Sequence, residues 1–156
     1  MKVRKLFLAA PLLMFAAFSV NADMADLMLQ QKIKKIEKKL TQQYLPNCST
    51  PRNKYDKVYC SGKLYSMFDD ALNKKYSEAQ KSLSTAQKSA LKKVQLKWIR
   101  KRDGQCATVT NKGVMMNLTC AKVRTLESYF YLDLIENNPQ NFNQLMKDYS
   151  KRASMH

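Results

Sequence analysis

The feature that most constrains this chain of 156 residues is its set of four cysteines, which are Cys48, Cys60, Cys106 and Cys120. An even number of cysteines in an exported chain indicates disulfide bonds, although four cysteines can be connected in three ways. Pairing of neighbours, Cys48 with Cys60 and Cys106 with Cys120, would close two short loops. Each disulfide would stabilise the folded state by about 3 kcal/mol. A zinc site would need C-x-x-C pairs or nearby histidines, and His156 is the only histidine. We therefore predict disulfides and no metal site, with a reactive thiol pair as the alternative.

The first 22 residues indicate the compartment. "MKVRK" is basic, "LFLAAPLLMFAAFSV" is apolar, and Val20-Asn21-Ala22 supplies small residues for cleavage. The apolar run is shorter than the roughly 18 residues expected of a spanning helix. The sequence thus predicts a signal peptide at 1–22, a single domain at 23–156 that does not span a membrane, and a periplasmic or secreted location. An uncleaved membrane anchor is the alternative.

Apolar residues recur at intervals of three and four along most of the chain, whereas strand alternation is almost absent. The predicted fold class is therefore all-α, a disulfide-stapled bundle of four to six helices. Three helices are predicted in the first half: a basic helix at 24–44, a short helix capped by Thr50 and ending at Cys60, and a long helix at 63–83. A fourth helix begins with a Ser84/Gln87 capping box and ends at Gly104. A fifth runs from Cys120 to Asn137, and the last follows Asn138-Pro139. Between them, Ser61-Gly62 should break or bend the chain, residues 104–116 should form a loop, and the tail beyond Ser150 should fray.

The helix from Cys120 to Asn137 is marked by the apolar spacing of Cys120, Val123, Leu126, Phe130 and Leu134.

The formal net charge of +16 favours an anionic partner, although the lysines could also serve only solubility. Catalysis is not expected, because a nucleophile would lack a histidine base and carboxylates on helices are usually solvated or ion-paired. No cofactor-binding glycine loop or metal motif is present. The chain is therefore interpreted as a binding protein without a cofactor. Nucleic acid is an unlikely partner, since Trp98 is expected in the core and export removes the chain from nucleic acid.

One motif is more specific than the rest. It consists of L-N-x-x-Y at 72–76 and Q-x-x-W-I-x-x-R-D-x-x-C at 95–106, with a C-x11-C pair before it and a C-x-x-x-R helix after it. Over residues 48–132 this pattern resembles the N-terminal domain family of LprI-type lysozyme inhibitors. The resemblance implies an exported, disulfide-bonded, all-helical bacterial domain that inhibits a lysozyme. The matching motif residues are Leu72, Asn73, Tyr76, Gln95, Trp98, Arg102, Asp103 and Arg124.

These motif residues are expected to have mainly structural roles. Gln95, Trp98 and Arg102 share one helix face, because their spacings are three and four. Arg102 could pair with Asp69 or Asp70, and Asp103 could hold the loop beyond Gly104.

The loop before Cys120 departs from the family pattern, in which Gly-Gly-Ser is common, and reads "NKGVMM". Closed by a Cys106–Cys120 bridge, it would present Lys112 at its tip to the carboxylate-containing cleft of a lysozyme. The candidate contact residues are Asn111, Lys112, Gly113 and Val114. A simple surface connection is the alternative for this loop. For the whole chain, the alternative function is binding of an anionic cell-envelope polymer, or an immunity-type pairing with an acidic toxin.

Overall fold

The computed structural model describes residues 16–155, so most of the predicted signal peptide lies outside the described residues. The chain divides into two compact units, residues 1–32 and 33–156. Helix α1 (Ala16–Tyr44) begins in the first unit and ends in the second. It starts before the predicted position 24 and ends where predicted. Within residues 16–155, no helix has the length and apolar character needed to cross a membrane.

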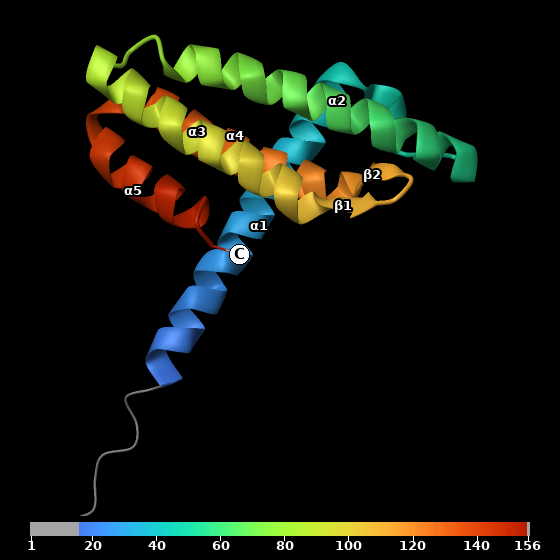
Figure 1. The fold of residues 1–156 in the computed structure, drawn as a ribbon, viewed down its shortest axis with the longest axis horizontal. Coiled ribbons are helices and arrows are strands. Elements are labelled where there is room, and N and C mark those ends of the chain that lie inside the picture. The colour runs from blue at the N-terminus through green and yellow to red at the C-terminus, as the bar shows by residue number, and fades with distance from the viewer. Residues whose placement is uncertain (1–15, 156) are drawn as a thin grey trace, which may run out of the picture. The chain divides into compact units, whose positions relative to one another are not determined.

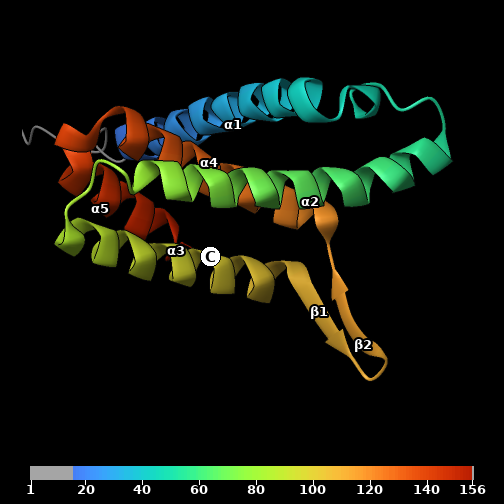
Figure 2. The same cartoon turned by 90° about the horizontal axis from the view of Figure 1, so that it is seen from above.

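The second unit is built around helix α4 (Leu118–Asn137), which packs against α2 (Lys54–Ala79), α3 (Thr85–Cys106) and α5 (Phe142–Arg152) (Figures 1 and 2). Two short 3-10 turns, η1 (Pro46–Cys48) and η2 (Pro139–Asn141), precede α2 and α5. Strands β1 (Ala107–Thr110) and β2 (Gly113–Met116) form an antiparallel hairpin between α3 and α4. The all-α prediction is confirmed, and this hairpin is a small addition to it.

Helix α2 is one continuous helix, so the prediction of a short helix broken at Ser61-Gly62 is wrong. Its N-cap is Asn53, not Thr50, because the Asn53 side chain accepts a hydrogen bond from the Asp56 backbone amide (2.9 Å). Gly62 lies exposed inside the helix, where glycine costs only about 1 kcal/mol relative to alanine. The helix also ends earlier than predicted, at Ala79.

Helix α3 begins as predicted and ends later. Ser84 and Gln87 form the expected capping box. Helical structure continues through Gly104 to Cys106, and the predicted loop at 104–116 is a helix end followed by the hairpin. Glycine disfavours a helix without forbidding it, and an exposed Gly104 with no atom near its missing side chain is tolerated there.

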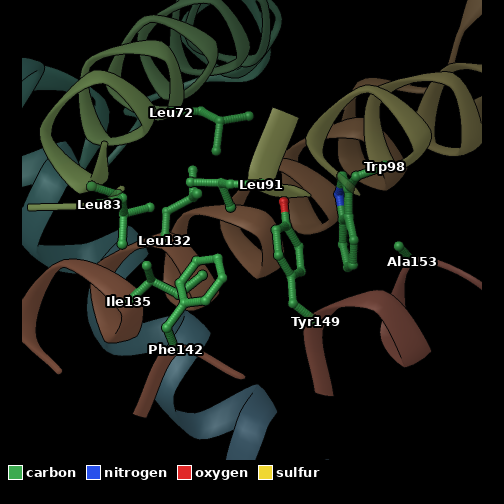
Figure 3. Packing of buried hydrophobic residues seen from close by; sticks show 10 residues of the cluster. Leu72, Leu83, Leu91, Trp98, Leu132, Ile135, Phe142, Tyr149 and Ala153 are labelled. Atoms are coloured by element: carbon green, nitrogen blue, oxygen red, sulfur yellow. The ribbon is translucent and has the colours of Figure 1, made fainter. Parts of the chain in front are cut away.

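The apolar core joins α2, α3, α4 and α5 (Figure 3). Tyr149 stacks on Tyr131, with ring centroids 5.1 Å apart, and tilts against Trp98 at 5.2 Å. Ala153 is also buried, so the prediction of a frayed tail beyond Ser150 is wrong. The members of this cluster are Leu72, Ala79, Leu83, Leu91, Trp98, Leu132, Ile135, Phe142, Tyr149 and Ala153.

The helix that Cys120, Val123, Leu126, Phe130 and Leu134 mark in the sequence is confirmed as α4, but of these five residues only Leu126 is fully buried. The other buried positions of α4 are Ala121, Thr125, Glu127, Ser128, Leu132 and Ile135. A helix contacted by several neighbours is buried on more than one face, so a single apolar stripe does not describe it. Polar residues are accepted on these faces because they find partners across the helix interfaces.

Candidate functional site

The guanidinium group of Arg102 connects three helices of the second unit. Arg102 on α3 is only 7% exposed, and its Nη1 donates to Asp69 Oδ1 on α2 (2.7 Å) and to Thr125 Oγ1 on α4 (3.1 Å). Its Nε donates to Asp103 Oδ1 (2.9 Å). Pairing with Asp69, rather than Asp70, confirms one of the two predicted partners. The Asp103 carboxylate accepts from Arg102, and its role in holding the loop beyond Gly104 stays a prediction.

Burial alone would lower the pKa of Arg102, but the hydrogen bonds to Asp69 and Asp103 outweigh burial and raise it. The guanidinium therefore stays charged, and Arg102 also lies near the Tyr65 ring, 5.8 Å from its centroid.

Gln95 lies two turns and Trp98 one turn before Arg102, on the same face of α3. Trp98 is buried as predicted, and its Nε1 donates to the Arg124 carbonyl oxygen on α4 (3.0 Å). Gln95 Oε1 accepts hydrogen bonds from the Tyr149 hydroxyl (2.5 Å) and from Ser128 Oγ (3.2 Å). Three motif residues thus fix the positions of α4 and α5 against α3.

The other motif residues are more dispersed. Leu72 belongs to the core and Tyr76 packs against it, whereas Asn73 is exposed. Arg124 Nη1 donates to Glu127 Oε2 (2.9 Å). Glu127 is 2% exposed, and its other oxygen accepts from Arg152 Nη2 on α5 (2.9 Å). Glu127 is not predicted from the sequence, because nothing local distinguishes a buried carboxylate whose second partner is 25 residues away.

The candidate contact residues lie at the turn of the hairpin. Ala107 pairs with Met116 and Val109 with Val114. Gly113 has a φ of +130°, a conformation that residues with a side chain rarely adopt. Around the turn, Thr110 Oγ1 accepts from the Lys112 backbone amide (3.2 Å) and donates to the Gly113 carbonyl oxygen (3.1 Å). The predicted contact residues Asn111, Lys112, Gly113 and Val114 are all exposed.

The base of the hairpin is fixed by covalent and hydrogen bonds. Cys106 and Cys120 form a disulfide with their Cα atoms 5.5 Å apart, and Cys48 pairs with Cys60, so the predicted neighbour pairing is confirmed. The Asn117 amide donates to the Cys106 carbonyl oxygen (2.7 Å). The Asn117 side chain caps α4 by accepting from the Cys120 amide (3.0 Å). Both ends of the hairpin are therefore tied to helix ends.

The hairpin exposes apolar side chains on both of its faces. Val109 is 80% exposed, and Val114 and Met115 are each 68% exposed. Val109 and Val114 are directly paired and share one face, while Met115, paired with Thr108, lies on the other. Figure 2 shows the hairpin projecting away from the ends of α3 and α4. Of these three apolar residues only Val114 is among the contact residues predicted from the sequence; the alternation of "ATVT" before "NKG" is the signal that indicates the strand carrying Val109.

An apolar projection of this kind has the properties of a surface for binding a protein. No curated protein matches the chain, and no solved structure matches it. The family model for the lysozyme inhibitor LprI matches residues 47–127. This range contains both disulfides, Arg102 with its partners, and the whole hairpin. Because the match covers more than half of the chain, the protein belongs to the lysozyme inhibitor LprI family.

Proposed function

We propose that this protein is an exported inhibitor that blocks a peptidoglycan-cleaving lysozyme by surface contact and turns over no substrate. Membership of the LprI family supports the inhibitory activity. The basic and apolar segments within residues 1–22 support export by a signal peptide. Two disulfides fit an extracellular or periplasmic protein, since such bonds persist in oxidising compartments.

The hairpin is proposed as the element that enters the enzyme. A lysozyme cleaves its glycan with two carboxyl groups in a cleft. The Lys112 ammonium at the turn suits such carboxylates, and Val109, Val114 and Met115 supply apolar area to bury around it. The observation that carries this proposal is the exposure of these three apolar side chains on a hairpin closed by a disulfide. A pre-ordered hairpin loses little conformational entropy on binding.

The motif residues are proposed to act as the frame of the hairpin. Cys106 lies one helical turn after Arg102, and Arg102 is bonded to α2 and α4. The end of α3 is therefore held at a defined position, and the disulfide transmits that position to the hairpin. In this proposal Gln95, Trp98 and Arg102 influence inhibition without touching the enzyme.

The test is a turnover assay of the purified chain beginning at Asp23, against animal and bacterial lysozymes at two salt concentrations. We expect inhibition at sub-micromolar protein, and weaker inhibition by the Lys112→Glu variant and by the Val109→Ser/Val114→Ser double variant. Leu96→Ser is the matched control, because Leu96 is an exposed apolar residue on α3 outside the hairpin (46%). Absence of inhibition by the wild-type chain at both salt concentrations would overturn the function, and unchanged inhibition by both hairpin variants would overturn the hairpin's role.

A second function, binding of an anionic envelope polymer or an acidic toxin, is favoured by the ion pairing of most acidic residues within the fold. Most carboxylates are already engaged in ion pairs inside the fold, so the surface lysines are left largely uncompensated. Retention on peptidoglycan or lipopolysaccharide that disappears at high salt, without lysozyme inhibition, would support this second function. The ion-paired acidic residues are Glu37, Asp56, Asp69, Glu78, Asp103, Glu127, Asp133 and Glu136.

A further inference from the structure

A second group of exposed apolar side chains lies on the first turns of α2. Tyr55 is 87% exposed, Val58 76% and Tyr59 64%. Their spacings of three and four place them on one face of the helix. We call these three residues the tyrosine surface. Large apolar side chains gathered at such exposure are unusual on a monomer and mark a place where a partner binds.

This part of α2 is held in place by a disulfide, although its outer face is exposed to solvent. The Cys48–Cys60 disulfide ties it to η1, with the two Cα atoms 5.5 Å apart. Arg52 Nε donates to Asp56 Oδ2 (2.8 Å) just before the tyrosine surface begins. Between η1 and α2 lies a recess of about 480 Å³ whose lining includes Arg52 and Tyr59. A partner would therefore bind a pre-ordered helix with a recess beside it, so this helix would lose little conformational entropy on binding.

The tyrosine surface and the hairpin lie at the same end of the second unit. Helix α3 runs antiparallel to α2 and α4, so α2 and α4 begin where α3 ends (Figures 1 and 2). In Figure 2 the first turns of α2 extend past the start of α4, and the hairpin projects from the same end in a different direction. Each of the two projections is held by one of the two disulfides, and neither contributes to the core cluster.

The charges around both projections have the same sign. Lys54, Lys57 and Lys63 are exposed around the tyrosine surface, and Lys63 Nζ lies 5.7 Å from the centre of the Tyr59 ring. Lys112 supplies the cation of the hairpin. Asp56, which lies between Tyr55 and Val58 in the sequence, is ion-paired with Arg52 (2.8 Å). Tyrosines among cations are typical of the residues that contribute most to protein–protein binding, here toward a partner surface that combines carboxylates with apolar area.

We infer that the tyrosine surface is a second contact with the same lysozyme, so that the enzyme is held by two disulfide-anchored projections. This inference rests on the proposed function and extends it to a second element. A lysozyme cleaves its glycan with two carboxyl groups that lie within about 10 Å of each other, so in this inference Lys112 of the hairpin meets these groups while the tyrosine surface contacts the enzyme outside them.

The experiment compares four proteins with a lysozyme that the wild-type chain inhibits. They are the wild type, Tyr55→Ser/Tyr59→Ser, Val109→Ser/Val114→Ser and the control Leu96→Ser, each measured for Kd by calorimetry and for inhibition of turnover. We expect the tyrosine variant to bind roughly tenfold or more weakly, since truncated interface tyrosines often cost more than 1 kcal/mol each. Leu96→Ser should bind like the wild type. Thermal unfolding checks that all variants remain folded.

The outcomes separate this inference from the proposed function. A wild-type chain that inhibits no lysozyme overturns the proposed function and this inference with it. Weakened binding by the hairpin variant, together with unchanged binding by the tyrosine variant, overturns this inference alone. The inference is also overturned if the tyrosine variant binds lysozyme like the wild type but binds more weakly to vesicles containing phosphatidylglycerol or to peptidoglycan. If the tyrosine variant does not fold, oxidative footprinting of the wild-type complex decides: Tyr55 and Tyr59 should be protected by the enzyme, and unchanged labelling overturns the inference.

Discussion

At the scale of single residues, the arrangement of α2, α3 and α4 depends on the charge of Arg102. One guanidinium group donates to Asp69, Asp103 and Thr125, and the two carboxylates are only partly exposed (38% and 48%). Breaking one side of a buried ion pair is costly because the remaining groups lose their partner without regaining full hydration. The partial exposure of both carboxylates reduces this cost, because water can hydrate part of each group.

We predict that Arg102→Met lowers the free energy of unfolding by roughly 2 to 4 kcal/mol, somewhat below the cost of a fully buried pair. Methionine keeps much of the length of the side chain, so the charge and its hydrogen bonds are the main loss. Urea unfolding measures the change. The matched control is Arg100→Met on the exposed face of the same helix, which should stay within about 0.5 kcal/mol of the wild type. Equal effects of both substitutions would contradict the role assigned to Arg102.

The hydroxyl group of Tyr149 is the second critical polar group of the core. Burial raises the pKa of Tyr149, and the hydrogen bond with Ser128 only partly opposes this effect. The unfolded chain releases this proton near pH 10, whereas the folded protein retains it to higher pH. The folded state therefore binds more protons above pH 10, and stability falls there as pH rises. Tyr65, Tyr76 and Tyr129 act in the same direction, since burial raises the pKa of each.

We predict that Tyr149→Phe destabilises the protein by about 1 to 2 kcal/mol at pH 8, because Gln95 and Ser128 lose a buried partner. Phenylalanine does not titrate, so the difference between wild type and variant should shrink between pH 8 and pH 11. Denaturant unfolding at these pH values measures it. A difference that stays constant or grows with pH would show that the hydroxyl is not held in its protonated form by the fold.

At the scale of elements, two glycines have opposite structural roles. Gly113 follows the hairpin turn with a φ of +130°, whereas Gly62 lies in an exposed helical turn. At both positions an added Cβ would meet no atom within 4 Å. Steric crowding therefore does not distinguish them, and the backbone conformation alone decides the effect of alanine.

We predict that Gly62→Ala stabilises the protein by about 0.5 to 1 kcal/mol, because alanine favours the helix and restricts the unfolded chain. Gly113→Ala should destabilise the hairpin by about 1 kcal/mol or more and weaken lysozyme inhibition, since alanine is strained at this φ. Thermal unfolding and the inhibition assay together measure both substitutions. Inhibition unaffected by Gly113→Ala, in a protein whose hairpin is shown to be distorted, would argue against the hairpin as the contact element.

Between elements, polar networks join the helices where periodicity alone would place apolar residues. Lys75 on α2 reaches Glu136 (2.6 Å) and Asp133 (3.1 Å) on α4. Burial would lower the pKa of Lys75, but the hydrogen bonds to these carboxylates outweigh burial and raise it. Lys122 similarly pairs with Glu37 on α1 (2.6 Å). The positions of the helices are thus specified by charge pairs as well as by the core.

At the scale of the whole molecule, internal ion pairing leaves the excess of lysines to determine the external field. The net charge is +16 for the full sequence, and the paired carboxylates are held near fixed partners. Such a field acts over about 8 Å at physiological salt and mainly changes association rates.

We predict opposite salt dependences for the two proposed functions. Association with a strongly cationic lysozyme should become faster between about 50 and 300 mM salt, because screening reduces the repulsion at long range. Association with an anionic polymer should become slower over the same range. Stopped-flow measurements with each partner determine the rates. A lysozyme association rate that falls with salt would indicate that the enzyme presents a dominantly acidic surface to the inhibitor.

Much of the helical structure could be predicted because its signals are local. The Ser84/Gln87 capping box, the end of α1 and the end of α4 at Asn137 are each encoded within a few residues. The predicted helix breaks at Gly62 and Gly104 are wrong, because glycine destabilises a helix only modestly and both helices continue through it. The hairpin was missed because its two strands are only four residues long.

The sequence by itself determined the helical class and the family motif on one face of α3, whereas it left three cysteine connectivities open and the structure decided for Cys48–Cys60 and Cys106–Cys120. Tertiary structure alone decided that Arg102 chooses Asp69, that Glu127 is buried between Arg124 and Arg152, and that the tyrosine surface and the hairpin share one end. The physical reason is range: caps and periodicity depend on neighbours along the chain, whereas partner choice across helices depends on how distant segments pack.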